Sequence, residues 1–249
     1  MRWIVFALGG VLSIGSAAAE PADVCEAPEY LVHTEGRLNR VAAAVANEHR
    51  LPILVVGTGS SVLTGPDGLR NAYPARLEAA LAARLPGTNV TVQTNVQSRR
   101  TAADMLNALE AVVLESKPKL VIWQTGTVDA MRGVDPDEFR TTLEDGIKKL
   151  HAAGADVILV NMQYSPRTES MIAAGTYADN MHLVAQQHDI PLFDRLGIMR
   201  HWSENGVFDF AAHPADSRMA ARVHDCIGKL MAELIIEQAH LNKKSVDHK

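Results

Sequence analysis

Five short apolar runs separated by helical patterns are the feature that most restricts the fold of this chain. Most are rich in Val, Ile or Leu without polar alternation, which is typical of strands buried on both faces of a parallel sheet. They cover residues 53–56, 90–93, 120–123, 157–160 and 191–193. Because strands that alternate with helices form doubly wound sheets, the pattern predicts one α/β domain with a five-stranded parallel sheet.

The segments around these runs carry apolar residues at helical spacing, as Leu77, Leu81 and Leu85 illustrate. The predicted helices cover residues 38–48, 73–85, 101–115, 136–152, 171–187 and 215–239. Right-handed crossovers place such helices on both faces of the sheet, which gives three layers. Ligands of these sheets bind beyond the carboxyl ends of the strands, so a functional site is expected in the loops there.

The first residues have the features of a secretory signal peptide. Arg2 precedes an apolar run over residues 3–14, and Ala17 to Ala19 provide small residues for cleavage. The run is short for a membrane span, although an uncleaved anchor is the alternative. We therefore expect an exported protein, periplasmic or secreted, without stable membrane insertion after cleavage. Residues 1–19 form the signal peptide, 20–239 a single domain and 240–249 a polar tail.

Charge and cysteine content narrow the partners and the compartment. The net charge of −5 shows no basic excess, so neither nucleic acid nor an anionic membrane is an expected partner. The two cysteines, Cys25 and Cys226, predict one disulfide in an exported protein, with two buried free thiols as the alternative. Neither cysteine has a second ligand at metal-binding spacing, so we expect no metal there and no organic cofactor.

Two loops carry the candidate chemistry. The first strand runs into residues 57–65, a glycine- and serine-rich turn that can present a hydroxyl and backbone N–H groups to a developing anion. The turn lacks the lysine of a P-loop and the spacing of a dinucleotide-binding loop. His213 stands just before the last helix, at the same sheet edge, where an imidazole can act as a base towards a serine. His201 is an alternative base.

The order of these loops resembles that of the SGNH (GDSL) hydrolases, most of all an exported bacterial branch. In that family a Gly-Asp-Ser-x-x-x-Gly block follows the first strand, and its serine is the nucleophile. Residues 59–65 are similar, with Ser61 as the nucleophile and Ser60 in place of the aspartate. The family's last block, Asp-x-x-His ahead of the final helix, resembles residues 213–216, which begin with His213. Further similar segments are residues 73–74, 120–127 and 163–166. The resemblance implies a flavodoxin-like, SGNH-type sheet.

Three positions depart from the family's pattern. Arg99 stands about where a glycine donates its N–H to the oxyanion, and Val128 replaces an asparagine donor. Phe210 occupies the place of the aspartate that orients the histidine, so Asp209 is the nearest acid. Losing one oxyanion donor typically slows an enzyme by a factor of about 100 to 1,000. The backbone N–H groups of Ser61 and Arg99 remain candidate donors.

Several other residues at the sheet edge are candidates for oxyanion or substrate binding. The full set is Gly59, Arg99, Thr127, Asp129, Gln163 and Tyr164. Two of them have a structural alternative: a solvated loop for Arg99, and packing on the sheet edge for Tyr164. Asp156 and Asp194 are interpreted as strand-edge or cap residues rather than catalysts.

Two functions are consistent with these features. The first is an exported serine ester hydrolase, in which Ser61 attacks an acyl carbonyl, His213 transfers the proton and Asp209 orients the histidine. The family implies a small acyl ester as substrate, such as an acetyl group on an envelope glycan. The second is a catalytically inactive SGNH-like domain that binds a glycan or a protein partner, which the three departures favour.

Overall fold

The computed structural model describes residues 25–212 and 216–241. The signal peptide, His213 and nearly all of the predicted polar tail lie outside the described residues. The strands are β1 (Arg50–Gly57), β2 (Asn89–Val96), β3 (Leu120–Gln124), β4 (Asp156–Val160) and β5 (Leu192–Phe193). All four pairings are parallel, in the order β2-β1-β3-β4-β5, which confirms the predicted sheet.

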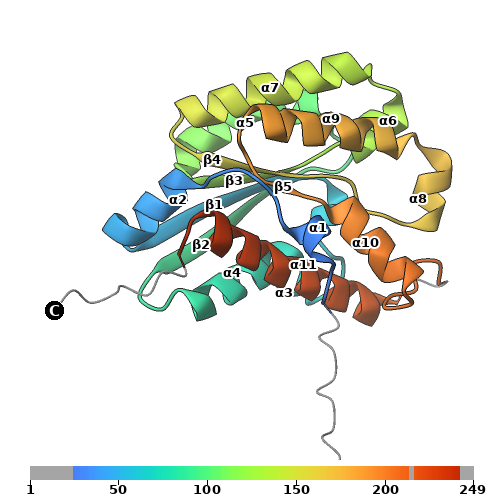
Figure 1. The fold of residues 1–249 in the computed structure, drawn as a ribbon, viewed down its shortest axis with the longest axis horizontal. Helices are drawn as coiled ribbons and strands as arrows, with labels where there is room; N and C mark the ends of the chain where they lie inside the picture. Colours follow the sequence, from blue (N-terminus) through green and yellow to red (C-terminus); the bar gives the residue numbers. More distant parts are fainter. Residues whose placement is uncertain (1–24, 213–215, 242–249) are drawn as a thin grey trace, which may run out of the picture.

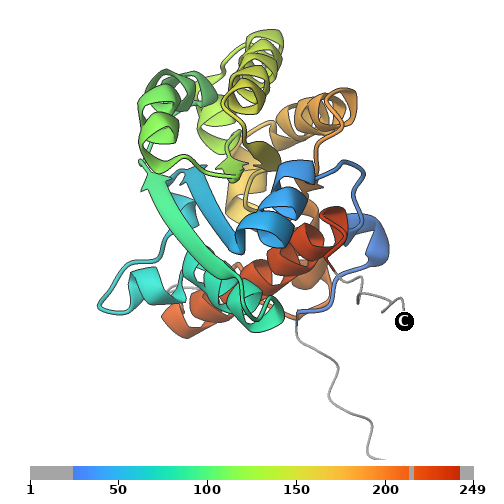
Figure 2. The same cartoon turned by 90° about the vertical axis from the view of Figure 1, so that its left-hand side faces the viewer.

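Helices cover both faces of the sheet, as predicted (Figures 1 and 2). One face carries α5 (Ala102–Ser116), α7 (Pro136–Ala152) and α9 (Ala174–Gln187), and the other carries α4 (Tyr73–Arg84) and α11 (Ser217–Gln238). Shorter helices are α1 (Glu29–Val32), α2 (Asn39–Ala43), α3 (Gly68–Asn71), α6 (Thr127–Arg132), α8 (Pro166–Met171) and α10 (Arg195–Glu204). A π-helical turn, Ala44–Glu48, follows α2.

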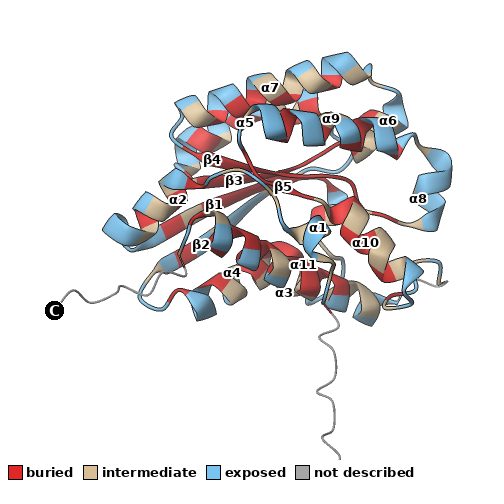
Figure 3. Ribbon diagram, in the orientation of Figure 1, coloured by how far each residue is buried: buried red, intermediate tan, exposed pale blue. Residues whose placement is uncertain are grey.

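Burial follows the position of each strand in the sheet (Figure 3). The strands β3 and β4 are buried at every residue, because helices cover both of their faces. The expectation of full burial was wrong for β2, in which only Val90 is buried. This strand lies at the edge of the sheet, so much of it faces solvent.

Capping residues fix where several helices begin. Asp135 accepts hydrogen bonds from the N–H groups of Asp137 and Glu138, so α7 begins at the predicted residue, Pro136. The helix predicted over residues 171–187 is α9, which begins at Ala174, and Met171 instead ends the preceding helix α8. Ser165 caps α8 by accepting a hydrogen bond from the Thr168 N–H at 3.0 Å, which starts a separate short helix.

The two aspartates interpreted as caps serve helix ends. Buried Asp156 accepts hydrogen bonds from the N–H groups of Arg40 and Val41, at 2.8 and 3.0 Å, and so holds the start of α2. Asp194 accepts one from the Gly197 N–H at 2.9 Å, at the start of α10. The interpretation of both residues as caps is confirmed.

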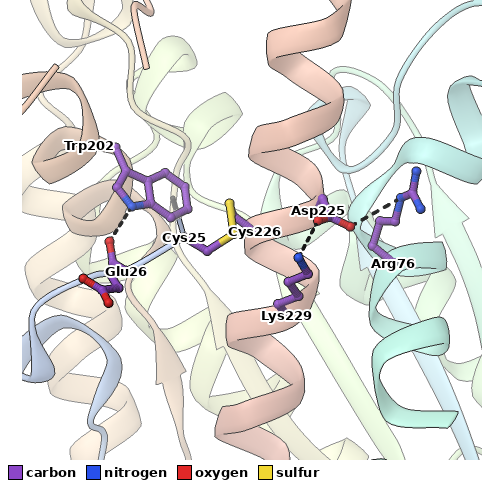
Figure 4. The surroundings of a disulfide bond; sticks show 7 residues. All are labelled: Cys25, Glu26, Arg76, Trp202, Asp225, Cys226 and Lys229. Atoms are coloured by element: carbon purple, nitrogen blue, oxygen red, sulfur yellow. Dashed lines mark hydrogen bonds and ion pairs between the residues drawn. A yellow bond between two sulfur atoms is a disulfide. The ribbon is translucent and has the colours of Figure 1, made fainter. Parts of the chain in front are cut away.

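A disulfide joins Cys25 to Cys226 in α11, as predicted (Figure 4). Next to it, the Trp202 indole N–H donates a hydrogen bond to the Glu26 carbonyl at 2.9 Å. Further along the same segment, the Thr34 hydroxyl accepts one from the Leu192 N–H in β5. The N-terminal segment is thereby attached to α10, α11 and the edge of the sheet. Among the described helices, none is both long and apolar enough to cross a membrane.

We predict that replacing both cysteines, Cys25→Ala with Cys226→Ala, lowers the free energy of unfolding by about 2–5 kcal/mol. The reason is that the bond spans 201 residues and so restricts the unfolded chain strongly. Urea unfolding of the oxidised wild type, the reduced wild type and the double variant measures the effect. The reduced wild type should match the variant, and equal midpoints for all three would contradict the prediction.

Candidate active site

A tight turn at the end of β1 presents the two serines of the motif. Gly59–Ser61 form one turn of 3-10 helix, in which the Ser61 N–H donates to the Thr58 carbonyl at 2.9 Å. This backbone donor is therefore already occupied. The sequence predicted that the Ser61 N–H is available to an oxyanion. In this conformation of the turn it is not, because the N–H forms the hydrogen bond of the 3-10 helix.

The two serine hydroxyls differ in exposure. Ser61 is fully buried, and its Oγ donates to the Gln124 Oε1 at 2.9 Å. Ser60 is partly exposed, and its Oγ accepts a hydrogen bond from the Gln124 Nε2 at 2.6 Å. Gly57 leaves room for this arrangement, because a side chain there would overlap the Ser61 hydroxyl. One amide at the end of β3 thus holds both hydroxyls.

Arg195, which the sequence analysis did not single out, completes this cluster. Its Nη1 donates to the Ser60 carbonyl at 3.1 Å and to the Gln124 Oε1 at 3.0 Å, and its Nη2 donates to the Gln163 Oε1 at 3.4 Å. Gln163, predicted to line the site, is thereby brought to the serine turn. Arg195 directly follows the Asp194 cap after β5. A search for functional residues beyond the strand ends would therefore have found this arginine.

Burial perturbs the titration of the groups around this guanidinium. It lowers the pKa of Arg195 to about 10 and raises that of Tyr73 to about 12. The Arg195 Cζ lies 5.9 Å from the centre of the Tyr73 ring. His224 in α11 accepts a hydrogen bond from the Tyr73 N–H at 2.9 Å, and burial, together with the nearby Arg195 charge, lowers its pKa to about 3. A neutral imidazole therefore caps the start of α4.

Arg99 takes the backbone conformation that its family counterpart, a glycine, favours. Its φ of 64° lies in the left-handed region, and its side chain is exposed. Its carbonyl accepts a hydrogen bond from the Arg132 Nη2 at 2.9 Å. The loop after β2 thus keeps a glycine-like shape without a glycine.

Asp129 serves helix ends rather than the serine turn. It is buried and accepts hydrogen bonds from the N–H groups of Ala102 and Gly126, at 2.9 and 3.3 Å, at the starts of α5 and α6. Burial raises the pKa of this carboxyl above its ordinary value, against these bonds. Thr127 is the first residue of α6 and is partly exposed, as is Val128.

The segment before position 213 is anchored by aromatic side chains. Phe210 packs edge-on against Tyr164, with ring centres 6.3 Å apart, and lies 6.0 Å from Phe208. Tyr164 is buried, which agrees with the alternative that this side chain packs on the edge of the sheet. Asp209 is exposed, and its Oδ1 accepts a hydrogen bond from the Ala211 N–H at 3.0 Å.

Of the two histidines predicted as candidate bases, the structure describes only His201. His213 lies outside the described residues, so its distance from Ser61 stays a prediction. His201 lies on α10, and its Nδ1 is 3.2 Å from the Asn205 side-chain nitrogen. Among the described residues, no group of three or more His, Cys, Asp or Glu side chains is arranged to hold a metal ion.

A groove of about 470 Å³ lies beside the serine turn. One wall follows directly from the turn, over residues 63–68, and the other is the first part of α11, including Ser217 and Arg218. The residues that line the groove include neither Ser60 nor Ser61, so it continues from the serine turn without containing the two hydroxyls.

Comparison with known proteins identifies the family. Residues 24–241 match the model of the Non-GDSL lipase-like family. The chain belongs to this family. The predicted resemblance to SGNH hydrolases is thereby confirmed, and the family's name agrees with the departures at the serine block.

Individual relatives agree with this assignment. Esterase TesA of Pseudomonas aeruginosa is 33% identical over 114 residues, which are 46% of this chain and 55% of that esterase. A crystal structure of TesA superposes with a TM-score of 0.56 at 25% identity, covering 73% of this chain and 98% of the other. A two-domain esterase active on acetylated mannans shares the fold, with a TM-score of 0.65 at 16% identity over 89% of this chain and 58% of the other.

We predict that His224 makes the protein less stable as the pH falls. Its folded pKa of about 3 lies below the ordinary 6.5, so the unfolded chain binds the extra proton between these values. Stability is therefore complete above pH 6.5 and is lost towards pH 3, with a slope of up to about 1.4 kcal/mol per pH unit. Urea unfolding at a series of pH values measures this slope.

The variant His224→Gln should flatten the profile between pH 6.5 and 4, whereas His49→Gln, at an exposed histidine, should leave it unchanged. Parallel profiles for the wild type and His224→Gln would contradict the assignment.

Proposed function

We propose that this protein is a serine-dependent ester hydrolase that acts on small acyl esters. The observation that carries the proposal is the pair of serine hydroxyls beyond β1, held by Gln124 and Arg195 at the sheet edge where ligands of such folds bind. Family membership and the similarity to an esterase support it.

In the proposed reaction, the Ser61 Oγ attacks the acyl carbon while His213 takes its proton. The histidine then passes this proton to the leaving alcohol. Water attacks the acyl-enzyme and gives a proton to His213, which passes this proton to Ser61 as the acid leaves. Asp209 is the proposed orienting acid.

Attack requires the buried Ser61 hydroxyl to turn away from Gln124. Rotation about its Cα–Cβ bond between staggered positions achieves this at the cost of one neutral hydrogen bond. Such a bond contributes about 1 kcal/mol, which is small compared with the barrier of an enzymatic reaction. The hydrogen bond to Gln124 is therefore compatible with a role of Ser61 as nucleophile.

The finer proposal is export to the periplasm or the medium, with an acetyl group on an envelope glycan as substrate. The disulfide supports an oxidising compartment. The groove beside the serine turn suits a small acyl group, and one protein of this fold is active on acetylated mannans.

A second candidate is a domain that binds a glycan or a protein partner without catalysis. The full burial of Ser61 and its occupied N–H favour this function. The two candidates differ in whether an acyl group is ever transferred to the protein.

We predict that Ser61→Ala lowers kcat on p-nitrophenyl acetate at least about 1,000-fold, because it removes the attacking atom. Ser60→Ala is the matched control and should stay within about tenfold of the wild type. A phosphonate ester with mass mapping should label Ser61 in the wild type only.

Loss of activity in Ser60→Ala alone would move the nucleophile to Ser60. The binding function would be established instead if the wild type binds an acetylated glycan but turns over neither aryl esters nor acetylated glycan esters.

A further inference from the structure

Arg195 carries a positive charge in the interior, and no carboxylate among the described residues forms an ion pair with it. The residue is 1% exposed. Its hydrogen bonds run to neutral oxygens of Ser60, Gln124 and Gln163, and its Nε has no partner among the described residues. The adjacent carboxylate of Asp194 is used elsewhere, since its Oδ1 accepts from the Asn161 side chain at 2.6 Å and caps α10.

This arrangement is costly for the folded protein. Transfer of a charge into the interior costs several kcal/mol when no opposite charge accompanies it. A methionine of similar length would fill much of the same space without that cost. Stability alone therefore does not explain a guanidinium at this position.

The charge is directed at the serine turn. Nη1 lies 3.1 Å from the Ser60 carbonyl oxygen and 3.5 Å from the Ser60 Oγ. The same nitrogen and the Ser61 hydroxyl both donate to the Gln124 Oε1, so they share one acceptor. Attack by a serine on an ester places a new negative charge on the carbonyl oxygen, close to this turn.

Two hydrogen-bond donors that would stabilise this negative charge in the SGNH family are not available in this structure. Val128 has no side-chain donor where the family has an asparagine, and the Ser61 N–H is bonded to Thr58. A fixed positive charge in a poorly solvated site interacts strongly with a charge that forms nearby.

We propose that Arg195 is a positioning residue of the esterase site, which fixes the serine turn through Ser60 and Gln124 and whose buried charge stabilises the negative transition state. This role rests on the proposed ester hydrolysis. If Arg195 has this role, its guanidinium raises the rate of ester hydrolysis and lowers the stability of the folded protein.

The test compares Arg195→Met, Arg195→Lys and the control Arg140→Met, in which the arginine pairs with Asp137 on the exposed side of α7. We expect Arg195→Met to lower kcat on p-nitrophenyl acetate about 100-fold, with KM within threefold and a Tm equal to or above that of the wild type. Arg195→Lys keeps the charge but not the planar fork, so about a tenfold loss of kcat is expected. Arg140→Met should match the wild type in kcat.

The outcomes separate this role from the proposed function. A wild type without esterase activity overturns both. An active wild type with Arg195→Met within threefold of its kcat overturns the role of Arg195 alone. A methionine variant that fails to fold, together with a lysine variant of full kcat, makes Arg195 a structural residue and also overturns the role.

Discussion

The parallel pairing of β1 with β3 determines where the serine turn and Gln124, the centre of the candidate site, lie. This pairing sets Val56 opposite Trp123, so the serine turn and Gln124 emerge side by side at the same edge. The amide of Gln124 then accepts from one serine and donates to the other. A slip of one residue would turn Gln124 towards the opposite face of the sheet, and both hydroxyls would lose their shared partner. The chemistry therefore depends on backbone pairing in the core.

The fold was largely predictable because its signals are local. The apolar runs located all five strands, and the spacing of Phe139, Leu143, Ile147 and Leu150 located α7. An apolar run does not encode the place of its strand in the sheet. Residues 90–93 belong to an edge strand, which only the strand order reveals. The short helices α6 and α10 were also missed, because caps such as Asp194 define them more than periodicity does.

The candidate site was less predictable because its contacts join distant segments. The motif indicated Ser61 and the loop of Arg99, and the two cysteines indicated the disulfide. The position of Arg195 directly after β5 is a local signal, but its burial and its contact with a turn 135 residues earlier in the chain are not. His224 has a helical sequence environment, and only the packing of α11 on α4 brings it to Tyr73. Such pairings require the tertiary structure.

The bond between Cys25 and Cys226 has a consequence for how the chain matures. With two cysteines in the whole chain, only one intramolecular pairing exists, so oxidation cannot trap a single molecule with wrongly matched sulfurs. The partner of Cys25 lies in the last helix and is among the final parts of the domain to be synthesised. The bond therefore cannot form until nearly all of the domain has been synthesised, and the competing oxidised products are those between separate molecules.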